Sequence, residues 1–336
     1  MRFTRTVRTA AVAFAVMAVA ATSSALSAQA DAPFTPDAND VVIVGSDTSE
    51  FVLNDLSALY NSKTPTPARR LASFNATGTP NITIRPSVSI PRPNGSGAGV
   101  TALCTRTDID SARSSRPKGA TDCADSRFLK FATDQLRWAA NDNTGAVTSL
   151  TDAQLTGIYN CTITDWHTIN PAIPAGSTIK PFLPQINSGT RTFWATQVGI
   201  NPATPPACVS DTFGGAPIQE HTVDAIDATP NSIVPISVGR YNLLTPTAQD
   251  GNYLGAIQAS DATAYDRTLF QVVKAVNNVI PAYLADLFGN GSGLSSTGGL
   301  PFICGRSDSN PATTTAGDII KANGFLELAL GQCGRI

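Results

Sequence analysis

The feature that most constrains the fold is a strand, turn and helix pattern near the start of the chain. Residues 41–44 (VVIV) form a continuous β-branched run, typical of a strand buried on both faces of a parallel sheet. A hydroxyl-rich turn follows at residues 45–49, and apolar residues then recur at helical spacing from Phe51 to Tyr60. Since units of strand, turn and helix build α/β domains, the sequence predicts an α/β fold.

Two later segments repeat this pattern, with glycine and small hydroxyl residues ahead of a helix-like run. They are residues 94–103 (NGSGAGVTAL) and residues 184–194 (PQINSGTRTFW). Such a turn is either an ordinary helix cap or an anion cradle, because the N–H groups of a first helical turn are unpaired and carry partial positive charge. In open α/β sheets, turns at the carboxyl ends of strands converge on one site. Three such turns, with the Ser/Arg loop at 113–116, therefore predict an oxyanion site.

The first 30 residues predict a signal peptide. Three arginines precede an apolar run at residues 10–21, and an A-x-A pattern ends at Ala30. We expect cleavage near Ala30 and a secreted protein, periplasmic or extracellular. These arginines belong to the 23 basic residues of the chain, so 20 basic residues remain against 25 acidic ones after cleavage. A net negative chain without a basic stripe speaks against nucleic acid as a partner.

The cysteines predict disulfides. All six lie in the exported part of the chain, where an even number usually means paired cysteines. Many pairings are possible, and we expect neighbours along the chain to pair: Cys104 with Cys123, Cys161 with Cys208, and Cys304 with Cys333. No C-x-x-C pair is present, and neither His167 nor His221 stands at a metal-ligand spacing from a cysteine. We therefore expect no metal site and no cofactor.

Six segments, taken together and in order, resemble the phosphate-binding proteins of ABC importers, which belong to the type II periplasmic binding protein superfamily. The segments are VGSDTSEFVLNDL (44–56), NGSGAGVTAL (94–103), TDIDSARSSRP (107–117), LTDAQLTGIYNCTITDW (150–166), PQINSGTRTFW (184–194) and IVPISVGRYN (233–242). The chain looks like an actinobacterial-type relative that carries disulfides. The resemblance implies two α/β lobes joined by two crossing strands, with 31–140 and 241–336 as lobe I and 141–240 as lobe II. It also implies reversible closure around one anion and docking to a membrane permease, by a monomer.

The resemblance implies a set of ligand-binding residues, with two departures from the family pattern. The set is Asp47, Thr48, Ser49, Ser96, Arg113, Ser115, Ser188, Gly189, Thr190 and Arg191. Pro184 stands where the family has an arginine, so the charge partner is missing unless Arg191, Arg113 or Arg116 replaces it. Ser115 stands where the family has an aspartate that accepts the proton of bound phosphate, and Asp47 or Asp110 are the candidate replacements. Phosphate is the expected ligand, with another small oxyanion as the alternative.

Other functions have less support in the sequence. Residues 95–99 read GSGAG, which does not fit the G-x-S-x-G elbow of a serine hydrolase. We expect His167 and His221 on the solvated surface, and no catalytic residue. The three tryptophans, Trp138, Trp166 and Trp194, sit in apolar patterns typical of core packing rather than of sugar stacking. An extracellular binding or adhesive protein of the same fold, with another small ligand and no transport role, remains the alternative; a secreted hydrolase is less favoured.

Overall fold

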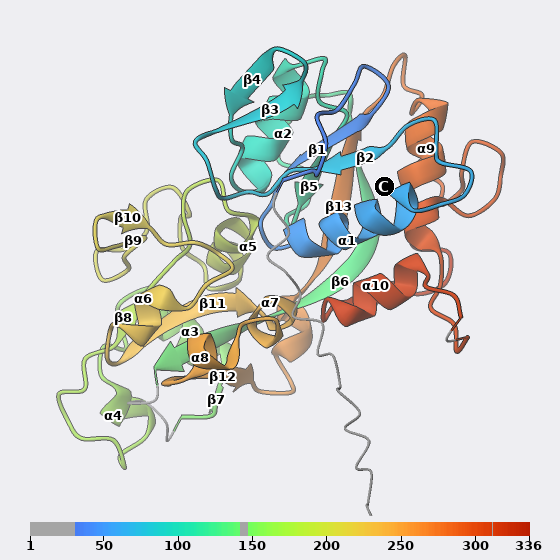
Figure 1. The fold of residues 1–336 in the computed structure, drawn as a ribbon. Coiled ribbons are helices and arrows are strands. Elements are labelled where there is room, and N and C mark those ends of the chain that lie inside the picture. The colour runs from blue at the N-terminus through green and yellow to red at the C-terminus, as the bar shows by residue number, and fades with distance from the viewer. Residues whose placement is uncertain (1–30, 142–146, 311) are drawn as a thin grey trace, which may run out of the picture.

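The fold is an alternation of strands and helices, seen in a computed structural model that describes residues 31–141, 147–310 and 312–336 (Figure 1). The strands are β1 (Val41–Gly45), β2 (Leu71–Ser73), β3 (Asn81–Arg85), β4 (Val88–Pro91), β5 (Ser111–Ser114), β6 (Ser126–Asn141), β7 (Ser149–Leu150), β8 (Lys180–Pro181), β9 (Thr212–Phe213), β10 (Ala216–Pro217), β11 (Ser232–Ser237), β12 (Asn252–Ile257), β13 (Asp266–Lys274) and β14 (Leu326–Glu327). The helices are α1 (Glu50–Asn61), α2 (Ser96–Thr105), α3 (Asp152–Tyr159), α4 (Trp166–Ile169), α5 (Gly189–Gln197), α6 (Asp224–Asp227), α7 (Val238–Asn242), α8 (Pro246–Gln249), α9 (Ala282–Phe288) and α10 (Ala316–Ala322), with short 3-10 helices η2 (Ala262–Tyr265) and η3 (Phe302–Cys304). The predicted α/β class is confirmed.

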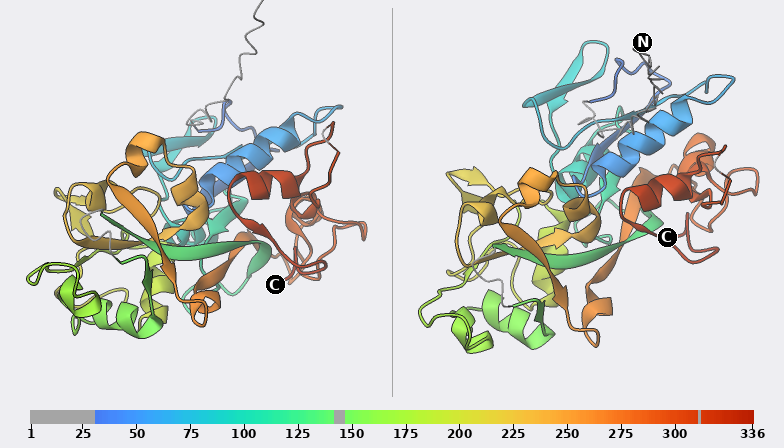
Figure 2. Two further views of the ribbon diagram at one scale, coloured as in Figure 1. Left: turned by 90° about the horizontal axis from the view of Figure 1, so that it is seen from below. Right: turned by 60° about the horizontal axis from the view of Figure 1, so that its bottom comes forward.

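One mixed sheet runs through both lobes of the molecule. Its main path is β2-β1-β5-β13-β6-β11-β8, and β12 and β14 pair with β6 beside this path. Strand β1 is parallel to β2 and β5, whereas β13 is antiparallel to β5 and β6. Figure 2 shows from two further sides how β6 passes from one lobe into the other.

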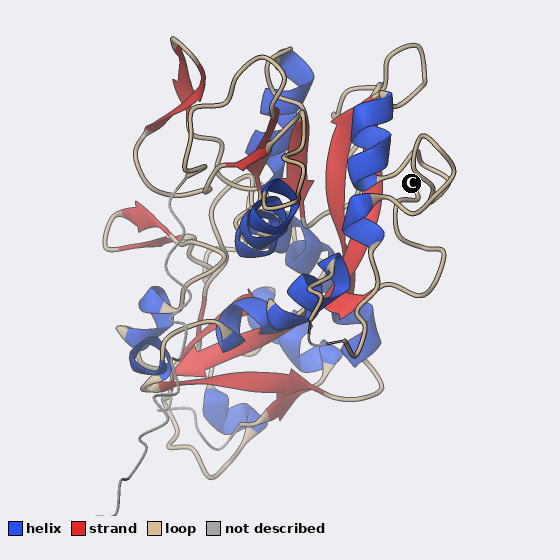
Figure 3. Cartoon of the chain, turned by 45° about the vertical axis from the view of Figure 1, so that its right-hand side comes forward, coloured by secondary structure: helices blue, strands red, loops and turns tan. Residues whose placement is uncertain are grey.

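The first lobe has an apolar core on each face of its sheet. Val41 and Ile43 pack with α1, α9 and α10, whereas Val42 and Val44 pack with α2, β3 and β4. Successive side chains of a strand point to opposite faces, so a strand covered on both sides needs an unbroken apolar run. The pattern of residues 41–44 is therefore explained by the two layers of helices, which Figure 3 shows against the strands.

The second lobe is built around aromatic side chains. Trp138, Trp166 and Trp194 are fully buried in one core with Tyr159 and Tyr265. The indole N–H of Trp138 donates to the carbonyl of Ala256. The expectation that the tryptophans are core residues is confirmed, and none of them is free to stack on a sugar.

Two strands connect the lobes. In β6, Leu129 and Phe131 pack in the first lobe, whereas Leu136 and Trp138 pack in the second. Tyr265 precedes β13 and packs in the second lobe, and Leu269 within β13 packs in the first. The sequence makes residues 232–242 a candidate for the second crossing strand, but these contacts favour β13 instead. They also place residues 257–265 with the second lobe. The predicted lobe boundaries stay a prediction, and the contacts favour a later boundary than residue 240.

The helical pattern that the apolar spacing suggests from Arg267 to Leu287 is wrong in its first half. Residues 266–274 form β13, which is hydrogen-bonded on both sides, and only α9 is helical. An apolar run buried on both faces has no clear period, so pairing with neighbouring strands decides its conformation. The sequence predicts a last helix over residues 316–330, but α10 ends at Ala322, where Asn323 and Gly324 follow.

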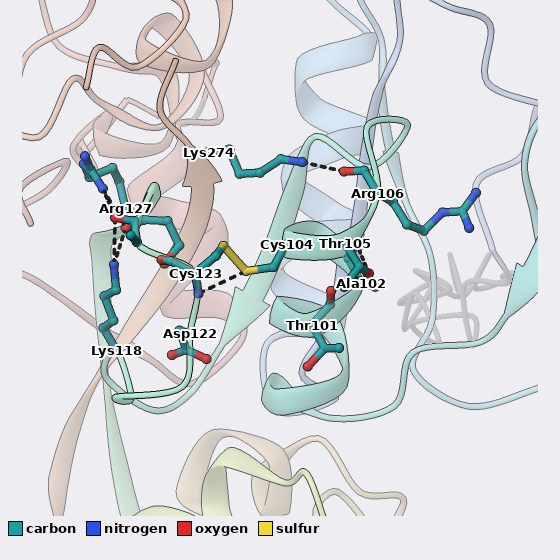
Figure 4. The surroundings of a disulfide bond; sticks show 12 residues. Thr101, Ala102, Cys104, Thr105, Arg106, Lys118, Asp122, Cys123, Arg127 and Lys274 are labelled. Carbon is teal, nitrogen blue, oxygen red and sulfur yellow. Dashed lines mark hydrogen bonds between the residues drawn. A yellow bond between two sulfur atoms is a disulfide. The ribbon is translucent and has the colours of Figure 1, made fainter. Parts of the chain in front are cut away.

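Three disulfides join the predicted cysteine pairs. They are Cys104–Cys123, Cys161–Cys208 and Cys304–Cys333. Figure 4 shows the first, which fastens the end of α2 to the loop before β6. Cys104, Cys304 and Cys333 pack in the first lobe and Cys208 in the second, beside α3, which Cys161 follows. These three bonds therefore do not tie one lobe to the other.

Candidate functional site

Three hydroxyl-rich turns meet where the two lobes face each other. The turn before α1 carries Thr48, α2 begins at Ser96, and Ser188 is the N-cap of α5. The hydroxyls of Thr48 and Thr190 are 3.3 Å apart although they belong to different lobes. The N–H of Gly97 donates across the same junction to the carbonyl of Asn187, at 2.9 Å. The sequence expectation that these turns converge is confirmed by this geometry.

Gly189 has no side chain because its neighbours leave no space for one. A Cβ atom at this position would lie 2.2 Å from the hydroxyl of Ser115 and 2.4 Å from that of Ser96. These two serines are buried and hydrogen-bonded to each other, and Ser115 also contacts Ser46. The glycine thus lets α5 approach the second turn closely. Ser96 and Ser115 thus lie beside α5, and their role as ligand-binding residues stays a prediction.

A side chain of the protein itself lies in the cradle. The carboxylate of Glu220, on the loop between β10 and α6, is 1% exposed. Its Oε1 accepts from the hydroxyl of Ser46 at 3.0 Å, and from the N–H and hydroxyl of Thr48 at 3.2 and 2.9 Å. Its Oε2 accepts from the hydroxyl of Ser188 and from the N–H of Thr190. In this structure the first and third turns therefore hydrogen-bond a carboxylate, that of Glu220.

A buried arginine supplies positive charge to the cradle. Arg267 of β13 donates from Nη2 to the hydroxyls of Thr190, at 2.9 Å, and Thr48, at 3.3 Å. Its Nε donates to Asp134 of β6, which holds the guanidinium in place. The Nη1 atom is buried and has no hydrogen-bond partner. Arg267 thus has a donor left over for a larger anion.

Arg240 of α7 is a second buried arginine in this region. It stacks on the ring of Phe51 in α1, with its guanidinium carbon 3.7 Å from the ring centroid. Its Nε and Nη1 atoms are buried without a hydrogen-bond partner. Burial lowers the pKa of Arg240, and the nearby carboxylates of Glu50, Asp47 and Glu220 oppose that shift. Unpaired buried donors of this kind are costly, which marks the region as a site rather than as core.

The three arginines that the sequence offers as replacements for the missing family arginine make their hydrogen bonds outside the cradle. Arg113 donates to the carbonyls of Gly45 and Ser46, so it supports the first turn from behind. Arg191 donates to the carbonyl of Pro184 and pairs with Asp211, and Arg116 pairs with Asp122. Each of these guanidinium groups donates to acceptors outside the cradle, so the replacement of the family arginine by one of them stays a prediction that these contacts do not favour.

Asp47 and His221 form a pair at the edge of the cradle. The Nδ1 atom of His221 is 2.7 Å from Oδ2 of Asp47, and Asp47 is fully buried. Our expectation that His221 lies on the solvated surface is wrong, because its ring packs into this pair. Asp110, the other candidate acceptor, is bound to Arg85 and Tyr283 instead. Ser49 lies in the first turn, but its buried hydroxyl has no partner.

The buried carboxyls of Asp47 and Glu220 lie close together, and their pKa values shift in opposite directions. Burial and the negative charge of Glu220 raise the pKa of Asp47 to about 7. Burial alone would raise the pKa of Glu220, but its interaction with the neighbouring Asp47 carboxyl, the charge of Arg267 and hydrogen bonds from Ser188 and Thr190 lower it to about 2. Burial lowers the pKa of His221, and the bond to Asp47 outweighs it, so the net shift is upward. At neutral pH the cradle therefore holds an ionised Glu220.

The donor set suits an anion and not a cation. Neutral hydroxyls and backbone N–H groups point their hydrogens at one carboxylate, and the guanidinium of Arg267 donates to the hydroxyls of Thr48 and Thr190. Among the residues that the structure describes, no group of three or more His, Cys, Asp or Glu side chains is placed to hold a metal ion. In the same part of the chain, no helix has the length and apolar character needed to cross a membrane.

A family model described as a PBP superfamily domain matches residues 19–284. The chain belongs to the PBP superfamily. Solved structures of the same two-lobed superfamily fold include a putative phosphate ABC transporter substrate-binding protein from Clostridium perfringens, with bound phosphate. It is 17% identical, has a TM-score of 0.59, and the match covers 87% of this chain and 100% of that one. A phosphate-binding protein from Stenotrophomonas maltophilia is 13% identical, with a TM-score of 0.52 and coverage of 87% and 91%.

These two likenesses show the type II PBP fold. A comparison with curated proteins found no match. Within the PBP superfamily fold, the residues that sequence reasoning missed are Glu220, Arg240 and Arg267. Arg267 sits in the segment that we expected to be helical, and Arg240 sits in a segment that we expected to be a strand. Glu220 stands in a loop without a motif, so its role depends on long-range folding that no local pattern predicts.

Proposed function

We propose that this protein is a secreted solute-binding protein that captures an oxyanion, with inorganic phosphate as the ligand, between its two lobes for import by an ABC permease. One observation carries the proposal: donors from both lobes converge on a single carboxylate in a buried cradle. A carboxylate and a phosphate oxygen pair accept hydrogen bonds in the same way. The neighbours from Clostridium and Stenotrophomonas, described as phosphate-binding, support the choice of phosphate.

The bound phosphate takes the place of the Glu220 carboxylate. Thr48, Ser188 and Thr190 then donate to two of its oxygens, as they do to Glu220. The other oxygens reach the unpaired donors of Arg267 and Arg240. Asp47, whose Oδ1 has no partner, is the acceptor for the proton of the phosphate. Binding therefore requires closure and hydrogen bonding, without a catalytic step.

Export follows from the first 30 residues, which we propose are cleaved near Ala30. The three disulfides suit the oxidising compartment that such export implies. The protein acts there as a monomer that delivers phosphate to a membrane permease.

The test is calorimetry on the oxidised mature protein at pH 7, with phosphate and then sulfate. We expect phosphate to bind, and Ser188→Ala to weaken it at least about tenfold, which is about 1.4 kcal/mol. The matched control is Thr151→Ala, because Thr151 caps α3 in the same way as Ser188 caps α5 but lies outside the cradle. No phosphate binding to either the wild-type protein or Glu220→Ala would contradict the proposal.

A further inference from the structure

The hydrogen bonds of Glu220 reach both lobes of the protein. Oε1 accepts from Ser46 and Thr48 of the first lobe, and Oε2 accepts from Ser188 and Thr190 of the second. One carboxylate therefore joins the two lobes, which is the role that a captured solute has in a two-lobed binding protein. We propose that Glu220 is a built-in ligand, which holds the lobes closed without solute and must leave the cradle before phosphate can bind. This inference rests on the proposed function.

The residues beside Glu220 act on the same junction. The side-chain N–H of Asn94, in the first lobe, donates to the side-chain carbonyl oxygen of Gln219, at 2.8 Å. His221 pairs with Asp47 of the first lobe, at 2.7 Å. Three consecutive side chains of one turn, Gln219 to His221, thus contact the first lobe. We call these three residues the latch.

The backbone of the latch is held by buried residues at its two ends, whereas the latch residues themselves make side-chain contacts. Ile218 and Val223 are buried in the apolar core under α6 and hold the two ends of the segment. Between them, residues 219–222 belong to no helix or strand. A rotation of this short turn moves the Glu220 carboxylate out of the cradle without disturbing either anchor.

A hollow lies next to the latch on the solvent side. It has a volume of about 440 Å³ and is lined by Arg92, Asn94, Gln185, Asn187, Asp211 and Gln219. Gln185 donates to Asn94 and Asn94 donates to Gln219, so a chain of side-chain amides lines the hollow beside the latch. The hollow has room for the latch when it swings out of the cradle.

The carboxylate satisfies only part of the site. Nη1 of Arg267, Nε and Nη1 of Arg240, and the hydroxyl of Ser49 stay unpaired while Glu220 is bound. A carboxylate offers two oxygens, whereas phosphate offers four and reaches more of these donors. The tether gives Glu220 a high local concentration, which phosphate has to overcome. Glu220 thus lowers the apparent affinity for phosphate by the fraction of time for which it fills the cradle.

The first test is calorimetry of phosphate with three proteins. We expect Glu220→Ala to bind phosphate at least about tenfold more tightly than the wild-type protein. Asp224→Asn is the matched control, because Asp224 is exposed on α6 and its loss removes one negative charge without touching the cradle. It should bind phosphate as the wild-type protein does. Equal or weaker binding by Glu220→Ala would overturn the inference and leave phosphate binding intact, whereas no binding by any of the three would overturn the proposed function.

The second test needs no ligand. Small-angle X-ray scattering measures the separation of the lobes in the phosphate-free proteins. We expect a compact wild-type protein and a larger radius of gyration for both Glu220→Ala and Glu220→Gln, since a glutamine amide would point an N–H group at donors. An unchanged radius in both variants would contradict the role of Glu220 in closure, whatever the outcome with phosphate. The use of two variants keeps the test valid if one of them fails to fold.

Discussion

At the scale of the residue, the buried acid groups decide how the site responds to pH. The folded protein raises the pKa of Asp47 from 3.8 to about 7 and raises that of His221 above 6.5. A raised pKa stabilises the fold below the unfolded value, and this contribution is lost as the pH rises through the folded value. Glu220 has the opposite sign, because its pKa falls from 4.5 to about 2, so its contribution is lost only in strong acid.

We therefore predict that the free energy of unfolding falls between pH 5 and pH 8, by about 1 kcal/mol or more. Asp47→Asn should remove most of this slope, because an amide does not titrate. Urea denaturation at several pH values measures the free energy of unfolding of the wild-type protein and of Asp47→Asn. A slope that is the same with and without Asp47 would show that other groups cause the dependence.

Arg267 and Asp134 are a buried ion pair, 1% and 0% exposed in their side chains. We predict that Arg267→Met destabilises the fold by about 3 kcal/mol, because it leaves the Asp134 carboxylate uncompensated. The second substitution, Asp134→Asn, should recover part of this loss. A double-mutant cycle of unfolding free energies measures the coupling between Arg267 and Asp134. If the losses of the two single variants simply add in the double variant, the predicted coupling is contradicted.

At the scale of the element, the decisive contact is the close approach of α5 to the second turn. We predict that Gly189→Ala destabilises the protein by about 1–3 kcal/mol and weakens phosphate binding, because a Cβ would overlap the hydroxyls of Ser96 and Ser115. Gly299→Ala is the control, since a Cβ there meets only Ser295, at 3.7 Å. Equal stability for the two variants would show that the packing around Gly189 tolerates a methyl group.

Strand and helix prediction succeeded where the sequence has local signals. The run at 41–44 and the hydroxyl-rich turns before α1, α2 and α5 each have a pattern of a few residues. Prediction failed at β13, because its pairing partners β5 and β6 are distant in sequence and its apolar run has no clear period. The candidate site follows the same rule. The turns were predictable from local sequence. Glu220 and Arg267 are far from them in sequence, and only the folded chain brings them together.

At the scale of the whole molecule, one carboxylate is the centre of a group of polar contacts that join the lobes. The cores lie within the lobes, and the three disulfides do not bridge them. Closure therefore depends on bonds from Thr48, Thr190, Glu220 and the latch, together with β6 and β13 as connections. Such an arrangement suits a protein that opens and closes around a small anion.

The central claim is that the cradle at Ser188 and Thr190 binds phosphate. A crystal structure of the mature protein, grown with phosphate and with the Glu220→Ala variant alongside, tests it most directly. We predict a phosphate between Thr48, Ser188 and Thr190, with the guanidinium of Arg267 against it and, in the wild-type protein, Glu220 turned out of the cradle. A cradle without phosphate in the variant, where no carboxylate competes, would contradict the account.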